Sequence, residues 1–126
     1  MLVVDDEPDH RLTLRAILER GAAAAVVAAA TPDEALRAAD QRRFAVAVID
    51  LRLPGRDGLA VMHALRQTQP WLQVIILTAY PSPTTTRTAL SEGAAAYLEK
   101  PYDPEALRTL VDRLLAGEPS ALGGSD

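Results

Sequence analysis

Two patterns of apolar and polar residues alternate along this chain. In some segments apolar residues recur every three or four positions, which places them on one face of a helix. Elsewhere they form short continuous runs, which are typical of strands that are buried on both faces of a parallel sheet. The runs cover residues 2–4, 23–30, 44–49, 72–77 and 94–98.

Residues that start and stop helices separate the two patterns. Thr31-Pro32-Asp33-Glu34 combines an N-cap threonine, a proline at the first helical position and a glutamate that can close a capping box. Ser82-Pro83 and Asp103-Pro104 repeat the cap followed by a proline. Glycines stand where three of the helices should end, at Gly21, Gly93 and Gly117.

The alanine-rich run at 23–30 is ambiguous, because alanine favours helices. The stop at Gly21 and the start at Thr31 leave it only the length of a strand. The sequence therefore predicts strands at 1–5, 24–30, 44–50, 72–78 and 94–99, and helices at 8–20, 32–41, 57–68, 83–92 and 103–116.

Five strand–helix pairs in alternation predict an α/β fold with a doubly wound parallel sheet and right-handed crossovers. In such sheets the functional crevice lies beyond the carboxyl ends of the strands. We expect residues 1–116 to form one domain. Residues 117–126 have the composition of a flexible tail, or of the start of a linker to an output domain absent from this sequence.

Composition agrees with one globular domain and narrows its function. The chain has 126 residues, 48% of them hydrophobic and 24% charged, which is enough for a single core. A formal net charge of −4 gives no sign of nucleic-acid or membrane binding. The lack of cysteine excludes disulfides and cysteine-based zinc sites. The sequence shows no signal peptide or membrane-spanning run, so we expect a cytoplasmic protein.

Charged and hydroxyl residues stand directly after the apolar runs of four predicted strands. Asp5 and Asp6 end the first strand and Asp50 the third, while Thr78 ends the fourth and Lys100 the fifth. Three carboxylates at one edge of a sheet repel one another, which raises some of their pKa values or requires a cation. A carboxylate-rich site of this kind suits Mg²⁺.

A bound divalent ion would leave one carboxylate able to attack a phosphoryl group. Asp50 is the best placed, because it stands alone at the end of a central strand. Lys100 would offer a positive charge to one phosphoryl oxygen, and the Thr78 hydroxyl and the Ala79 backbone N–H would offer hydrogen bonds. The residues therefore predict phosphoryl transfer that depends on positioning and charge.

Other polar and aromatic residues have a structural interpretation. Asp57-Gly58 is interpreted as a turn and helix start. His10 and His63 lie on separate predicted helices without metal-ligand spacing, so we expect surface or packing roles for both. Trp71 is expected to anchor the loop before the fourth strand. The helix at 83–92 is rich in threonine, which loses side-chain freedom in helices, so we expect it to be short or mobile.

Five motifs occur in a fixed order along residues 2–115. They are Asp5-Asp6, Asp50-Leu51-Arg52-Leu53-Pro54-Gly55-Arg56-Asp57-Gly58, Leu77-Thr78-Ala79, Gly93-Ala94 and Tyr97-Leu98-Glu99-Lys100-Pro101. In this order and spacing the chain resembles the receiver domains of response regulators in two-component systems. The resemblance implies a flavodoxin-like fold, with five parallel strands in the order 2-1-3-4-5 and five helices.

The resemblance also implies the roles of the acidic residues. Asp50 would be the phosphoacceptor. Asp6 and Asp50 would bind Mg²⁺ directly, together with the backbone carbonyl of Arg52, and Asp5 would contribute through water. As a phosphoacceptor switch, the domain would catalyse its own phosphorylation and dephosphorylation rather than act as a conventional enzyme.

Three further residues would make the switch. Lys100 would contact the phosphoryl group, and the Lys100–Pro101 bond is expected to be cis. Thr78 would move toward the phosphoryl group on activation, and Tyr97 would be the aromatic residue coupled to it. Arg52 and Tyr80 each lie two residues after a site residue, where the family tunes water access, which suggests slow or altered autodephosphorylation.

The implied partner is a sensor histidine kinase that donates the phosphoryl group from phosphohistidine. The output surface would comprise the helix at 83–92, the strand at 94–99 and the helix at 103–116, which could also form a homodimer. The style of the motif at Asp50 favours an attached output domain that regulates transcription. A stand-alone regulator that acts by protein–protein interaction is the alternative.

Other functions for a related fold agree less well with the residues. An aspartyl-phosphate-forming phosphohydrolase would carry a second aspartate two positions after its nucleophile, where this chain has Arg52. A flavoprotein would need a phosphate-binding loop after its first strand, where Asp5 and Asp6 would repel the phosphate. An interaction module that needs no phosphorylation would not require the full set of site residues.

Overall fold

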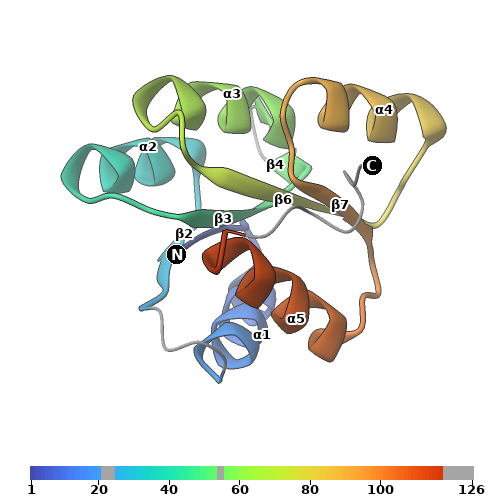
Figure 1. Cartoon of the computed structure of the whole chain (residues 1–126), viewed down its shortest axis with the longest axis horizontal. Helices are drawn as coiled ribbons and strands as arrows, with labels where there is room; N and C mark the ends of the chain where they lie inside the picture. Colours follow the sequence, from blue (N-terminus) through green and yellow to red (C-terminus); the bar gives the residue numbers. More distant parts are fainter. Residues whose placement is uncertain (21–24, 54–55, 118–126) are drawn as a thin grey trace.

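Figure 1 shows the computed structural model of the chain, which describes residues 1–20, 25–53 and 56–117. Helices α2, α3 and α4 cover one face of a central sheet, and α1 and α5 cover the other. In the described ranges, the strands of this sheet are β1 (Leu2–Val4), β2 (Val27–Ala29), β3 (Val46–Asp50), β6 (Gln73–Thr78) and β7 (Ala96–Glu99). The helices are α1 (Pro8–Glu19), α2 (Pro32–Gln41), α3 (Gly58–Thr68), α4 (Pro83–Ser91) and α5 (Pro104–Leu115).

The strands of the sheet are all parallel and lie in the order β2-β1-β3-β6-β7. Numbered along the chain without the two short strands of a separate hairpin, this is the expected order 2-1-3-4-5. The order reverses between β1 and β3, so the crevice beyond their carboxyl ends is the place where a sheet of this kind binds its ligand. The predicted fold is confirmed.

The separate hairpin was not predicted. It pairs β4 (Arg52–Leu53) with β5 (Arg56–Asp57) in antiparallel register, directly after Asp50. Strands of two residues are too short to show a periodic pattern, so apolar periodicity could not predict them. The expectations for Gly21, for residue 24 and for the tail at 118–126 lie outside the described residues.

The core has one layer on each side of the sheet. Strand residues alternate between the two faces, as the pleat requires. Ala47 and Ile49 of β3 pack with Leu65 and the other buried residues under α2, α3 and α4. Val48 packs instead with Leu107 and the residues under α1 and α5. Both layers hold the central strands in place, and the residue that ends β3 is Asp50.

Predicted caps begin the helices. The Thr31 hydroxyl accepts a hydrogen bond from the Glu34 backbone N–H at 3.1 Å, and the Glu34 carboxylate accepts one from the Ala30 N–H at 2.8 Å. At the starts of α4 and α5, the Ser82 hydroxyl accepts a hydrogen bond from the Thr85 N–H and the Asp103 carboxylate accepts one from the Glu105 N–H. Gly93 follows α4 with a φ of 110°, which other residues rarely adopt, and so supports the expected helix stop.

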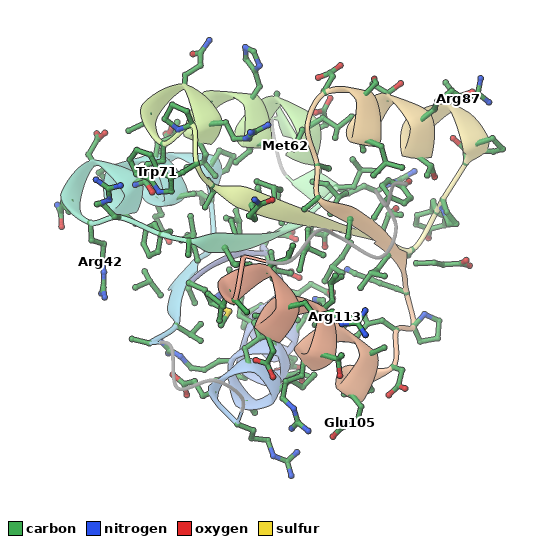
Figure 2. The ribbon with its side chains drawn as sticks, in the orientation of Figure 1. Arg42, Met62, Trp71, Arg87, Glu105 and Arg113 are labelled. Carbon is green, nitrogen blue, oxygen red and sulfur yellow. The ribbon has the colours of Figure 1, made fainter. Side chains whose placement is uncertain are left out.

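Trp71 anchors the loop before β6, as predicted. Its indole Nε1 donates a hydrogen bond to the Phe44 carbonyl at 3.0 Å. The Arg43 guanidinium carbon lies 3.9 Å from the centre of the indole ring. Figure 2 shows Trp71 and Arg42 at the same end of the molecule, beside α2. None of the helices in the described ranges is both long and apolar enough to cross a bilayer.

Candidate functional site

Asp50 and Lys100 form an ion pair at the carboxyl edge of the sheet. Lys100 follows β7, and its Nζ donates a hydrogen bond to Oδ2 of Asp50 at 2.8 Å. The Arg52 backbone N–H donates to the other oxygen, Oδ1, at 3.0 Å. These two hydrogen bonds fix the direction of the Asp50 carboxylate, and the residue is 8% exposed where it lines a pocket.

A glycine allows α3 to begin against the strand that carries Asp50. The Gly58 N–H donates to the Leu51 carbonyl at 2.6 Å. A Cβ at Gly58 would lie 2.4 Å from the backbone carbonyl oxygen of Asp50, which is too close for any other residue without a backbone shift. Asp57 caps α3 by accepting a hydrogen bond from the Ala60 N–H at 2.8 Å. The structural interpretation of Asp57-Gly58 is confirmed.

Asp5 is fully buried below the edge of the sheet, and both of its carboxylate oxygens are paired. Oδ1 accepts a hydrogen bond from the Glu7 N–H at 2.9 Å, and Oδ2 pairs with Nδ1 of His10. Burial alone would raise the pKa of the Asp5 carboxyl. The hydrogen bonds from His10 and Glu7, with the nearby charges of His10 and Lys100, outweigh burial and hold this pKa below its ordinary value.

His10 contacts the predicted site residue Asp5, so it packs at the edge of the site rather than on the open surface. One ligand-type atom from each of Asp5, His10 and Asp50 lies within 4.8 Å of the others. The second ring nitrogen of His10, Nε2, lies 2.9 Å from the Tyr102 hydroxyl. Burial, together with the charge of Asp5, raises the pKa of Tyr102 to about 12. The sequence signal was present, because His10 lies in the first turn of the helix that follows the first strand.

Asp6 lies outside this three-residue cluster. It is exposed and lines a pocket of about 360 Å³, whose walls include Asp50 and Lys100. Asp50 belongs to both the pocket and the cluster, so a ligand in the pocket would contact the Asp50 carboxylate. The other residues that line the pocket are Glu7, Arg52, Ala79 and Tyr80.

Arg52 and Tyr80 lie together at the mouth of the pocket. The Arg52 guanidinium carbon is 4.4 Å from the centre of the Tyr80 ring, a distance typical of a cation–π interaction. Tyr80 is 65% exposed, so the pair is on the solvent side of the site. Sequence reasoning identified both positions, but not the contact between them.

Thr78 and Tyr97 are buried on neighbouring strands. The Thr78 hydroxyl oxygen accepts a hydrogen bond from the Tyr80 N–H at 3.0 Å. The Tyr97 ring is 7% exposed, and its hydroxyl lies 2.9 Å from Oγ1 of Thr85 on α4. The Lys100 N–H donates to the Thr78 carbonyl at 2.7 Å, which joins the two strand ends. The Lys100–Pro101 bond is cis, as expected.

The donor set fits a divalent cation. Carboxylates from Asp5 and Asp50 converge with the imidazole of His10, and Asp6 adds a third carboxylate at the pocket wall. The negative charge exceeds what Lys100 alone can balance, which is the condition under which a carboxylate site binds a metal ion. Asp50 is the carboxylate that belongs to the three-residue cluster and also lines the pocket.

Comparisons with known proteins agree with one another. A family model described as the response regulator receiver domain matches residues 1–112. The transcriptional regulatory protein ZraR of Escherichia coli O157:H7 is 36% identical over 116 residues, which cover 92% of this chain and 26% of that protein. A two-component response regulator of the LuxR family from Aurantimonas sp. SI85-9A1 has a TM-score of 0.85 at 32% identity, over 95% of this chain and 88% of that chain.

A third similar protein was solved in a modified state. It is a response regulator protein from Burkholderia pseudomallei with a phosphorylated aspartic acid, a calcium ion and citrate. The TM-score is 0.78 at 34% identity, over 98% of this chain and 74% of that one. The chain spans about a quarter of the length of the curated relatives that it matches.

Proposed function

The chain belongs to the response regulator receiver domain family of two-component systems, and from this premise we propose that it is a phosphorylation switch with Asp50 as the phosphoacceptor. The observation that carries the proposal is the pairing of Asp50 with Lys100 at 2.8 Å, beside a pocket of about 360 Å³. A carboxylate fixed by a lysine and a backbone N–H, and open on one side, is arranged to attack a group that enters the pocket.

The proposed reaction moves one phosphoryl group. An oxygen of the Asp50 carboxylate forms a bond to phosphorus as the bond from phosphorus to the donor nitrogen of a phosphohistidine breaks. The electron pair of that bond stays on the donor imidazole. Lys100 places a positive charge beside the phosphoryl oxygens, and the Ala79 N–H and the Thr78 hydroxyl provide hydrogen bonds. Hydrolysis by water later returns the carboxylate and releases phosphate.

A divalent ion, Mg²⁺ in the proposal, would balance the negative charge of the carboxylates and of the phosphoryl group. Asp6 and Asp50 would hold it directly, with the backbone carbonyl of Arg52, and Asp5 would orient its water. Asp5 suits that indirect role because both of its oxygens are already paired.

The proposed switch connects the site to α4. If the Thr78 hydroxyl turns toward a phosphoryl group, it gives up the hydrogen bond from the Tyr80 N–H. That change would loosen the loop into α4, where Thr85 holds Tyr97. The output surface would be α4, β7 and α5, and it would act on an output domain or a homodimer partner.

The wider role in the cell also belongs to the proposal. The phosphodonor would be a sensor histidine kinase in the cytoplasm. The output would be transcription, which is the role that the name of ZraR gives to that protein. The phosphorylated aspartic acid and the metal ion in the Burkholderia pseudomallei regulator support the same chemistry in this family.

A phosphodonor assay tests the proposal. Wild-type protein is incubated with Mg²⁺ and acetyl phosphate, and intact mass is measured with and without chelator. One phosphoryl group is expected on wild-type protein, none on Asp50→Asn, and one on the control Asp57→Asn, which keeps the cap of α3. Phosphorylation of Asp50→Asn would refute the assignment. It would also be refuted if wild-type protein stayed unmodified and beryllofluoride caused no change in its NMR spectrum. Steady release of phosphate from many substrates would favour a phosphohydrolase.

A further inference from the structure

We propose that His10 and Tyr102 are positioning residues of the switch. A chain of two hydrogen bonds, one between Tyr102 and His10 and one between His10 and Asp5, holds the Asp5 carboxylate in its working orientation. The inference rests on the proposed function, because Asp5 acts there as the acidic residue beside Asp50. It gives a role to two side chains that the proposed reaction does not use.

The backbone of Asp5 is fixed independently of His10. Its N–H donates a hydrogen bond to the Ala29 carbonyl at 3.1 Å, and its carbonyl accepts one from Nη1 of Arg11 at 2.8 Å. The carboxylate can still turn about its side-chain bonds. Oδ1 accepts the Glu7 N–H, and Oδ2 pairs with Nδ1 of His10. His10 is therefore the side chain that decides where Oδ2 points.

The chain of hydrogen bonds persists in both charge forms of His10. The lowered pKa of Asp5 keeps its carboxyl ionised at neutral pH, and an ionised carboxylate can only accept, so Nδ1 of His10 carries a proton. In the neutral imidazole Nε2 then accepts the Tyr102 O–H, and in the imidazolium Nε2 donates to the phenol oxygen instead. The distance of 2.9 Å between Nε2 and the Tyr102 hydroxyl suits both forms.

Tyr102 is placed to hold the imidazole. The two ring centres lie 5.9 Å apart with their planes inclined by 49°, so the rings do not stack and the hydrogen bond is the directional contact between them. Burial, followed by the charge of Asp5, raises the pKa of Tyr102 to about 12, so the phenol keeps its proton at neutral pH. Tyr102 comes two residues after Lys100, so the chain links the segment after β7 to the end of β1.

A positioning role and a merely structural role predict different results. In the proposed function Asp5 acts on the ion through water, whereas Asp50 and Lys100 meet the phosphoryl group. A misplaced Asp5 carboxylate should therefore raise the Mg²⁺ concentration that half-saturates the site, and leave the phosphorylation rate at saturating Mg²⁺ nearly unchanged. A loosened fold would instead reduce the fraction of protein that can be modified.

A graded set of variants tests the chain. Tyr102→Phe removes the phenol O–H, and His10→Asn keeps an N–H at the place of Nδ1 but has no counterpart of Nε2. We expect each to raise the half-saturating Mg²⁺ concentration by about 2- to 10-fold, the range of one hydrogen bond. His10→Leu removes both bonds and should raise it by about 10- to 100-fold. His63→Asn, at an exposed histidine of α3, should match wild type.

Three measurements cover the set. Amide NMR shifts during a MgCl₂ titration without phosphodonor give the half-saturating concentration. Intact mass after brief exposure to acetyl phosphate at saturating MgCl₂ gives the rate. Nitrogen-15 NMR of histidine-labelled protein shows whether Tyr102→Phe shifts Nε2 of His10 and leaves His63 unchanged, as we expect. The double variant His10→Asn/Tyr102→Phe completes a cycle, and it should bind Mg²⁺ no more weakly than His10→Asn alone.

The outcomes separate the explanations. Equal half-saturation in wild type, Tyr102→Phe and His10→Leu, or unshifted His10 nitrogens in Tyr102→Phe, would overturn the proposal. So would additive losses in the cycle, because residues that act through one chain cannot each lose the full effect. If His10→Leu does not fold, the cycle decides alone. A wild type that binds Mg²⁺ but is never phosphorylated counts against the proposed function, and not against the positioning of Asp5.

Discussion

At the scale of single residues, Arg52 and Tyr80 contact each other and line the same pocket as Asp50. In the proposed reaction, the water that hydrolyses the phosphorylated carboxylate would enter through this pocket, so both side chains would restrict its approach. A cation–π pair at an exposed position contributes about 0.5–1 kcal/mol, so the closed arrangement is favoured but not fixed. The structure thus gives a physical basis to the expectation of slow autodephosphorylation.

We predict that Tyr80→Ala and Arg52→Ala lose the phosphoryl group about 2- to 5-fold faster than wild type, because the free energy of the lost pair converts to that factor. The decay of phosphorylated protein in Mg²⁺ is followed by intact mass. Arg43→Ala is the matched control, since Arg43 also lies on an aromatic ring but at the other end of the sheet. Equal rates in all four proteins would show that the pair does not limit water access.

Tyr102 makes stability sensitive to alkaline pH. Its pKa is raised from 10.0 to about 12 in the folded protein, so between these values the unfolded chain loses the phenolic proton first. The folded state then binds more protons than the unfolded state, and stability falls as pH rises through this window.

We expect Tyr102→Phe to lose less stability than wild type between pH 10 and pH 12. Urea unfolding at several pH values across this range measures the effect, with Tyr80→Phe as a control that keeps Tyr102. If wild type and Tyr102→Phe change in parallel, the Tyr102 phenol is not the group that titrates.

At the scale of elements, α4 and α5 differ in how firmly they are held. Within Pro83–Ser91, α4 buries Ala89, whereas α5 buries Leu107, Leu110, Val111 and Leu114. The threonines of α4 bond back to their own helix, as Thr88 Oγ1 does to the Thr84 carbonyl at 2.9 Å. Such bonds do not fasten the helix to the sheet, so its attachment depends heavily on Ala89 and on the Thr85–Tyr97 contact.

Amide hydrogen exchange should therefore be faster in α4 than in α5 under conditions in which the protein stays folded, because local opening of α4 exposes little apolar surface. Native-state exchange followed by NMR measures both helices in one sample. Thr85→Val, which removes the contact with the Tyr97 hydroxyl, should widen the difference. Protection in α4 equal to that in α5 would contradict this view of a loosely held helix.

Most elements of the fold could be predicted because their sequence signals are local. The capping box at Thr31 and the stop at Gly93 lie in the sequence next to the helix ends they define. The hairpin of β4 and β5 could not be predicted, because two residues in each strand are too few to form a recognisable pattern. Strands β2, β3 and β7 are shorter than their apolar runs, because side chains beyond the ladder hydrogen bonds can also be buried.

The site was predictable where each residue ends a strand. Asp50 and Lys100 meet because parallel strands bring their carboxyl ends to one edge. His10 and Tyr102 come from a helix and a loop, and their contact joins positions far apart in sequence. A pattern of apolar residues carries no information about such a pair, so the side-chain geometry was needed to place His10.

At the scale of the whole molecule, the sheet divides the interior into two layers that pack independently. Val61 of α3 and Val111 of α5 belong to the two different layers. The strands between them are shared, but the side chains on one face do not touch those on the other.

We predict that Val61→Ala and Val111→Ala each lower the free energy of unfolding by about 2 kcal/mol. The double variant should lose the sum of the two within about 0.5 kcal/mol, because the sites share no side-chain contacts. Chemical denaturation of the four proteins tests this. A larger departure from additivity would mean that the sheet transmits packing changes from one face to the other.

The position of Trp71 makes it useful as a fluorescence probe. It is the one tryptophan of the sequence, and it stands before the amino end of β6, whereas Thr78 closes the other end of that strand. At about 3.3 Å per residue, roughly 20 Å of strand separates Trp71 from the proposed phosphorylation site. Its fluorescence should therefore report global unfolding. Binding of a ligand in the acidic pocket should leave this fluorescence unchanged. Tryptophan fluorescence can therefore measure stability on an unlabelled sample while ligand binding is measured separately, without interference between the two signals.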